Sequence, residues 1–205
     1  MFDTDLVFAA ACAAYRTNKF IYVKVSGYDA APKTLNKVLM KNFVMDPDTL
    51  TPDDHAKGAA MRTHFKGLIF KTLSGQVLGD IDKKALTLAS GDAVTDRDFG
   101  IIAYLPEAYA RAVKRQSVDE RLYQAQGGFI GKIGDKVVRT VEVLRGVFSI
   151  KWNCNFITAI TETDEVVFFS YKNGIEAGTK ISISGTVKSH RENQTQLNRV
   201  KIMVG

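Results

Sequence analysis

The sequence predicts an α+β protein: a mainly helical N-terminal part, residues 1–126, followed by a small five-stranded antiparallel β-barrel, residues 127–205. Two observations support this fold class. A chain of 205 residues with 45% hydrophobic content can bury one good core or two small ones. The pattern also changes near "QAQGG": helical spacing and cap signals come before it, and alternating apolar runs separated by glycine come after it. We therefore expect two parts of different structure.

The strongest helix signals lie early in the chain. Asp3 or Thr4 can cap a first helix that continues through Tyr15. In "TPDDHAKGAAMRTHFKGLIFKTLSG", Thr51 fits the N-cap position, proline follows at the first helical position, acids occupy the first turn, and Gly75 lies beyond the end. These signals predict one short helix and one long one.

Further helices are predicted at "DIDKKALTLASG", at "TDRDFGIIAYL" and from Pro106 to about Gln124. The last of these mixes apolar and basic residues, and its basic side chains are interpreted as a solvated face or as a contact to a phosphate backbone. Between the first two helices, "KFIYVKVSG" alternates like a strand, and "KTLNKVLMKNFVM" fits a helix or a strand. This region is therefore expected to hold either a small hairpin or a further helix.

From Gly127 onward the chain reads as five strands. They are "KVVRTVEVLRGVFSIKW", "NFITAITETDE", "VVFFSYK", "KISISGTVK" and "TQLNRVKIMV". A polar run from Ser189 to Gln196 is expected to form a loop between the last two strands, which makes it longer than the short turn that a hairpin needs. Five strands in about 79 residues leave no room for a large helix. The C-terminal part is therefore predicted to be all sheet.

A single sheet of this size must cover its apolar face, and curling into a barrel does so while removing most of the edge. The strand count, the long first strand with Gly146 in its middle, and the connection "NGIEAGT" fit an oligonucleotide-binding (OB) barrel. SH3-like barrels have similar strand counts and remain an alternative.

Three stretches of residues 127–205 resemble an OB-type module that recurs in phage-encoded replication and DNA-processing proteins. They are "GGFIGKIGDKVVRTVEVLRG", "GIEAGTKISISGTVKSH" and "QTQLNRVKI". Asn198 stands where that module usually has threonine, and the loop before Gln194 is shorter than is typical. The resemblance implies nucleic-acid binding in a phage-type replication setting, and a cytoplasmic location, which is the host cytoplasm if the protein is phage-encoded.

The charge and the cysteine content limit which partners and which cellular compartment fit the sequence. The net charge of +6 and the pI near 9.2 favour an anionic partner. Cys12 and Cys154 match no metal or redox spacing, so both are expected to be buried thiols in a reducing cytoplasm. The run "LVFAAACAAY" follows two acids and is too short to span a bilayer, so no targeting or membrane segment is expected.

The chemistry of single-stranded nucleic acid points to the barrel. Exposed bases stack on aromatic rings, and phosphates are neutralised by cations, so a binding surface needs both. The candidate contact residues are Arg145, Phe148, Lys151, Trp152, Phe156, Tyr171, Lys172, Lys188, His190, Arg191, Arg199 and Lys201.

Strand alternation divides the aromatic residues between two faces. It puts Phe168 with Ser170 on one face and Phe169 with Tyr171 on the other, and one of these faces must be core. Trp152 is flanked by polar residues and is predicted to be exposed. It is therefore the leading candidate for a stacking platform.

Catalytic and metal motifs are not found in the sequence. The run "GGFIGKIGDK" lacks the spacing of a phosphate-binding Walker loop and leads into a strand, while its resemblance to the clamping loop of KH domains is weakened because that loop joins two helices. The three histidines lack partners at metal spacing, and the acids resemble neither a two-metal nuclease site nor a calcium loop. The sequence therefore predicts a protein that is not an enzyme, with no cofactor and no metal.

The hypothesis from the sequence is a single-stranded DNA-binding protein of phage-type replication or recombination, which binds largely without sequence preference. DNA is favoured over RNA, and replication or recombination proteins are candidate partners. Two alternatives stay open: a docking module for a polymerase, primase or nuclease, and a DNA-processing enzyme whose site lies in residues 1–126.

Overall fold

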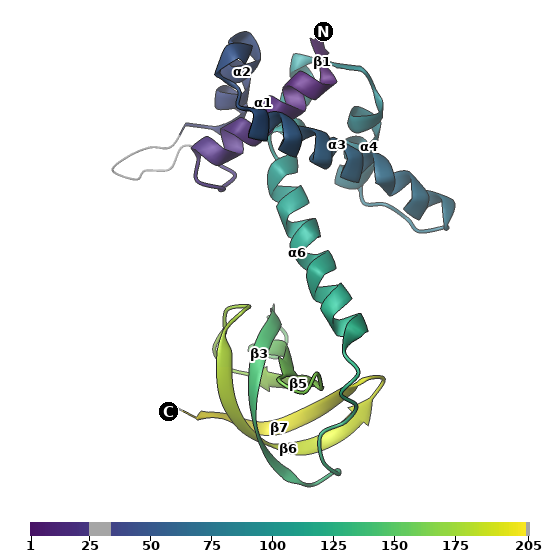
Figure 1. The fold of residues 1–205 in the computed structure, drawn as a ribbon, viewed down its shortest axis with the longest axis vertical. Helices are drawn as coiled ribbons and strands as arrows, with labels where there is room; N and C mark the ends of the chain where they lie inside the picture. The colour runs from purple at the N-terminus through teal and green to yellow at the C-terminus, as the bar shows by residue number, and fades with distance from the viewer. Residues whose placement is uncertain (25–33, 204–205) are drawn as a thin grey trace. The chain divides into compact units, whose positions relative to one another are not determined.

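The computed structural model describes residues 1–24 and 34–203. The chain forms two compact units, which we call the helical unit (Met1–Val113) and the barrel unit (Lys114–Gly205) (Figure 1). The division falls inside a long helix, so that helix contributes to both units. The boundary predicted between residues 126 and 127 stays a prediction.

The helical unit consists of short and long helices with one small strand pair. Its elements are β1 (Phe2–Asp3), α1 (Thr4–Thr17), α2 (Asn36–Met45), η1 (Pro47–Thr49), α3 (Pro52–Leu73), α4 (Asp80–Ser90), β2 (Ala93–Val94), η2 (Asp96–Asp98), α5 (Phe99–Ile102) and the first part of α6 (Leu105–Gln124). The strands β1 and β2 pair in antiparallel fashion.

The helix caps form as predicted. The side chain of Asp3 accepts a hydrogen bond from the backbone N–H of Leu6 at 2.8 Å, which caps α1. Thr51 and Asp54 form a capping box at the start of α3. The core of the unit forms around α1, whose alanines are fully buried. Small residues allow close packing here, because a Cβ on Gly58 of α3 would lie 2.7 Å from the backbone nitrogen of Ala9.

The strand predicted for "KFIYVKVSG" is wrong for residues 19–24, and residues 25–27 lie outside the described part. Lys19 and Phe20 have φ of 56° and 60°, which is incompatible with an extended chain. The backbone N–H of Val23 donates to the side chain of Asn36 instead of to a strand. The segment that fitted helix or strand forms α2, and the described residues of this region contain no hairpin.

The barrel unit holds the last part of α6 and a closed five-stranded barrel (Figure 1). The strands are β3 (Lys136–Ser149), β4 (Cys154–Thr161), β5 (Val166–Tyr171), β6 (Lys180–Arg191) and β7 (Gln194–Met203). Their order around the barrel is β3-β4-β5-β7-β6. The count and the closure agree with the prediction and are compatible with an OB-like fold.

The predicted all-antiparallel arrangement is wrong, because β5 pairs with β7 in parallel. The reason is geometric. Around a closed ring, strand directions can alternate without exception only if the number of strands is even, so a closed ring of five must contain at least one parallel pair. The sheet is therefore mixed.

The barrel interior is filled by alternate residues of every strand. Ile157, Phe169 and Ile183 are among its fully buried side chains. Strand β3 pairs first with β6 and then with β4, and an irregularity between Val143 and Arg145 lets it bend between these partners. That bend turns Val143 into the barrel core while Leu144 joins a separate buried cluster outside the barrel.

The polar loop predicted over residues 189–196 is also wrong. Strand β6 continues to Arg191 and β7 begins at Gln194, which leaves a turn of Glu192 and Asn193. Glu192 adopts φ of 52°, as a tight hairpin turn often requires. The polar residues can extend the strands because their side chains alternate, with Thr195 buried and Arg191 exposed.

Candidate nucleic-acid interface

Two aromatic rings stack on the outside of the barrel. Phe156 of β4 and Phe168 of β5 have ring centroids 5.7 Å apart and planes inclined by 16°. Their neighbours Ile157 and Phe169 are fully buried in the barrel core, so strand alternation turns Phe156 and Phe168 outward. Both rings are half-buried, which leaves part of each accessible. This pair is the centre of what we call the aromatic face.

The aromatic face continues across β7 to the end of β6. Gln196 lies beside Phe168 in the parallel pair, and the hydroxyl of Ser189 donates a hydrogen bond to the Gln196 side-chain oxygen at 3.1 Å. Two residues further along β6 from Ser189, Arg191 lies opposite Gln194 of β7. The basic and amide side chains of the last hairpin therefore share a face with the stacked rings. We define the aromatic face by these residues: Phe156, Phe168, Ser189, Arg191, Gln194 and Gln196.

The turn between β3 and β4 is unusually apolar for an exposed turn. Residues 150–153 make this turn, and we call them the hairpin tip. Ile150 is 89% exposed and Trp152 is 64% exposed. The Nζ of Lys151 lies 5.3 Å from the centroid of a Trp152 ring, within cation–π range. Trp152 is thus exposed as predicted, with a cation beside it.

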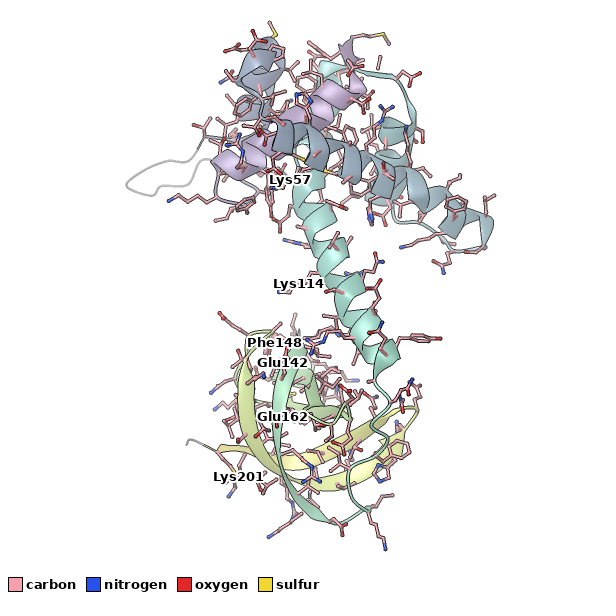
Figure 2. The ribbon with its side chains drawn as sticks, viewed as in Figure 1. Lys57, Lys114, Glu142, Phe148, Glu162 and Lys201 are labelled. Carbon is pink, nitrogen blue, oxygen red and sulfur yellow. The ribbon has the colours of Figure 1, made fainter. Side chains whose placement is uncertain are left out.

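Other predicted contact residues lie at the same end of the barrel. Phe148 is 55% exposed near the end of β3, where Figure 2 labels it. Tyr171 is half-buried and packs against the barrel core, so the face it shares with Phe169 is the inner one. Lys172 is exposed, and its backbone carbonyl accepts a hydrogen bond from the Asn155 side chain at 3.2 Å. Tyr171 is therefore less accessible than Phe148 and Trp152.

The remaining predicted residues on β6 and β7 are more widely spread. His190 packs against Phe129, with ring centroids 4.5 Å apart, and lies opposite buried Thr195. Lys188 is exposed where the β6–β7 register shifts, and Arg199 is exposed where the backbone takes a positive φ. Lys201 lies opposite Ser184 and away from Phe148 in Figure 2. The structure therefore joins Arg191 to the aromatic face and places Lys201 elsewhere on the barrel.

The last part of α6 covers one end of the aromatic face. Val118 and Leu122 pack against a buried cluster that includes Ile160 and Val166, the outward residues next to the stacked rings. Asp119 Oδ1 also lies 3.8 Å from Nη1 of Arg145. Within the barrel unit, Arg145 is thus the one predicted contact residue whose charge is partly balanced by an ion pair, as far as residues 114–203 are described.

The positive charge of the protein is concentrated in the barrel unit. That unit has 14 Lys and Arg against 9 Asp and Glu, a net charge of +5, whereas the helical unit has 14 against 13, a net charge of +1. The β3–β4 hairpin contains no acidic residue between Glu142 and Glu162. An anion approaching the hairpin segment between these two residues therefore meets no acidic side chain of that segment.

A polar hollow of about 200 Å³ lies beside β3 and β4 at the end away from the tip. Its lining includes Glu142 and Glu162, both labelled in Figure 2, and the basic Arg121 and Lys180. Arg121 donates hydrogen bonds of 2.7 and 3.1 Å to Glu142, which lower the pKa of that carboxyl. Charges of both signs line this hollow, so it has no preference for an anion.

The described residues hold no other recognisable site chemistry. They bring together no group of three or more His, Cys, Asp or Glu that could hold a metal ion. Both cysteines are free; Cys12 is buried, which raises the pKa of its thiol to about 12, but Cys154 is only half-buried, contrary to prediction. Among the helices in residues 1–24 and 34–203, none has the length and apolar character needed to cross a membrane.

Known proteins do not identify the chain. No family model, no curated protein and no solved structure matches it.

The predicted contact residues do not include Phe168 and Gln196, which lie on the aromatic face, or Ile150, which lies outside it in the hairpin tip. Alternation along "VVFFSYK" left Phe168 as one of two options, and the fully buried Phe169 decides between them. Gln196 falls where the predicted polar loop and the predicted last strand overlap, and its alternation with buried Thr195 and Leu197 is a strand signal. Ile150 belongs to a strand in the sequence pattern, and only the pairing of Ser149 with Cys154 shows that it begins the turn.

Proposed function

We propose that this protein binds single-stranded nucleic acid on the aromatic face of its barrel. The observation that carries the proposal is the outward Phe156–Phe168 stack, bordered by amide side chains and Arg191. Bases of a single strand stack on aromatic rings whatever their identity, so this arrangement suits binding with little sequence preference.

Charge supports the same proposal. The net charge of +5 in the barrel unit provides attraction for phosphates, and Lys151, Lys172 and Arg191 are exposed cations near the aromatic rings. Gln194 and Gln196 add hydrogen-bonding groups that can contact base edges or sugars. The finer proposal is a single-stranded DNA-binding protein of phage-type replication or recombination, which rests on the sequence resemblance, and one that is not an enzyme, which rests on the lack of catalytic motifs in the sequence.

The test is a titration of fluorescent dT and rU oligomers and of a DNA duplex against the intact protein. The proposal expects both single strands, or dT alone, to bind more tightly than the duplex. Phe168→Leu keeps an apolar side chain but removes the flat ring, so it should weaken single-strand binding about 5-fold or more. Val138→Ala is the matched control, because Val138 is 55% exposed on β3 opposite Ser184, away from the aromatic face.

A second function is favoured by exposed apolar residues of the helical unit. Phe70 and Leu73 near the end of α3 and Val77 after it are all highly exposed, which suits docking of another protein such as a polymerase, primase or nuclease. If none of the oligomers binds even at low salt, single-strand binding is refuted and the docking role becomes the leading proposal. If Phe168→Leu and Val138→Ala behave alike, the aromatic face is not the binding surface.

A further inference from the structure

The hairpin tip exposes more apolar surface than a solvated turn needs. Ile150 and Trp152 lie in one turn of residues 150–153, and both side chains are exposed. Hairpin turns are usually formed by Gly, Asn, Asp and Ser, which are well solvated. An isoleucine that is 89% exposed beside an exposed indole therefore indicates a surface that is covered when the protein is bound.

The charges around the tip favour an anionic occupant over a second protein. Lys151 lies within the tip, and Lys172 directly follows the neighbouring strand β5, where its backbone carbonyl accepts a hydrogen bond from Asn155. The nearest acids along the hairpin are Glu142 and Glu162, at the opposite end of the β3–β4 ladder. An apolar tip that carries a lysine, with no acid within the hairpin segment 143–161, matches the flat apolar face of a base pair with its phosphates on either side.

The shape of Ile150 distinguishes the tip from the aromatic face. Flat rings stack on the bases of an isolated strand, and the Phe156–Phe168 pair already provides them. Branched aliphatic side chains instead act on nucleic acid as wedges, which press against or enter a base step and partly unstack it. The tip combines one such side chain with one aromatic ring.

The tip is also continuous with the aromatic face. Val147, close to the tip on β3, lies directly opposite Phe156 on β4, so their side chains share the outer surface. A strand that separates from its partner at the tip would therefore pass next to Phe156 and then reach Phe168 and Gln196.

From these observations we propose that the hairpin tip binds the junction where a duplex opens into single strands. Ile150 and Trp152 cap the last base pair, Lys151 and Lys172 contact phosphates on the two sides of the fork, and one released strand lies on the aromatic face. The proposal rests on the proposed function. It adds a substrate preference, forked over plain single-stranded nucleic acid, and a weakening of the terminal base pair.

The experiment compares the intact protein on three DNAs of the same sequence: a forked duplex, a blunt duplex and a single strand. The base at the junction is 2-aminopurine, whose fluorescence rises when it unstacks. The wild-type protein is expected to bind the fork about 5-fold or more tightly than the single strand, as one additional stacked base would give, and to raise the signal. Ile150→Ser should remove both effects and leave single-strand affinity unchanged.

Val138→Ser is the matched control, since it also replaces an exposed β-branched residue, but on β3 away from the tip, and should change neither affinity. Equal binding of fork and single strand by the wild type, or an Ile150→Ser variant that keeps the fork preference, overturns this inference alone. Loss of all single-strand binding overturns the proposed function as well. If sedimentation shows that the tip instead joins two copies, through a dimer that Ile150→Ser abolishes, the inference is also overturned.

Discussion

The two units use charged side chains in opposite ways. In the helical unit, buried charges hold the fold together: Arg16 binds Asp54 at 2.8 Å, and Arg62, which is buried, binds Asp5 at 2.7 Å and two backbone carbonyls. In the barrel unit, Lys151 and Arg191 are exposed, and neither has an acidic partner within 4 Å in the described residues.

This difference shows that the net charge of the whole chain does not indicate which unit carries the unpaired positive charge. The whole chain carries +6, but almost all of this excess lies in the barrel unit. In the helical unit, basic residues are balanced by acids, and several of them are used in packing and capping. A partner attracted by charge is therefore expected to meet the barrel first.

The largest expected effects come from one glycine in each unit. In Gly58→Ala, the new Cβ would lie 2.7 Å from the Ala9 nitrogen where α3 crosses α1. In Gly127→Ala, it would overlap the backbone of Thr163 and Glu165. Neither neighbour is a flexible side chain, so each change should cost about 3 kcal/mol or more in its own unit.

Hydrogen exchange followed by mass spectrometry checks this, because it reports each unit separately. Gly58→Ala should reduce protection in the helical unit alone, and Gly127→Ala in the barrel unit alone. Gly67→Ala is the control, since a Cβ there meets no atom within 4 Å. Loss of protection in both units from either change would show that the two fold as one.

A smaller effect is expected from Asp54, which concerns the helical unit only. Burial alone would raise the pKa of Asp54, but hydrogen bonds from Arg16 and Thr51 outweigh it and lower the pKa from 3.8 to about 2. A carboxyl with a lowered pKa in the folded state stabilises the fold at neutral pH, and this contribution is lost as the pH falls from about 4 to about 2. Asp54→Asn should cost about 2 kcal/mol at pH 7.

Denaturant unfolding at pH 7 and at pH 2.5 measures this difference. The gap in unfolding free energy between the native protein and Asp54→Asn should shrink at the lower pH. Asp53→Asn is the control, because Asp53 pairs with Lys57 on the exposed side of the same helix turn. A gap that is the same at both pH values would refute the charged role of Asp54.

The smallest effect on stability, and a clear one on binding, is expected from the last hairpin. Arg191 and Arg199 are exposed, so replacing both with Ala should change the free energy of unfolding by less than about 0.5 kcal/mol. If each contacts one phosphate of a single strand, the slope of log affinity against log salt should become shallower by about 1.4.

A salt titration of oligomer binding provides the measurement. The charge-matched control replaces Lys84 and Arg97, two exposed residues of the helical unit, and should leave the slope unchanged. Equal changes from both double variants would mean that overall charge, not contact at the hairpin, governs binding.

Local signals in the sequence were sufficient for the capped helices α1 and α3, but they left α2 open between helix and strand. Thr51 and Pro52 identified the start of α3, and Asp3 the start of α1, because capping depends on neighbouring residues only. The strand predicted from the alternation of residues 19–24 is wrong because a strand depends on a distant partner. Here the backbone N–H of Val23 donates to the side chain of Asn36 instead. Pairing is a property of the whole chain, which local pattern does not contain.

The same limit applies to the candidate interface. Strand count and the exposed Trp152 could be predicted, but the parallel β5–β7 pair that brings Gln196 beside Phe168 follows from ring closure. The packing of Val118 and Leu122 over Ile160 joins residues far apart in sequence, so no spacing rule indicates it. Which aromatic residues face outward was decided by these long-range contacts.

The parallel pair also bears on how the barrel folds. Strand β7 bonds to β6, its neighbour in sequence, and to β5, from which it is separated by all of β6. The hairpins β3–β4, β4–β5 and β6–β7 can each form from adjacent segments, but the β5–β7 and β3–β6 pairs require longer loops to close first, and such non-local contacts slow folding. We expect these two seams to form last, so that a partly folded chain exposes the free edges of β3 and β5 until the β6–β7 hairpin docks between them.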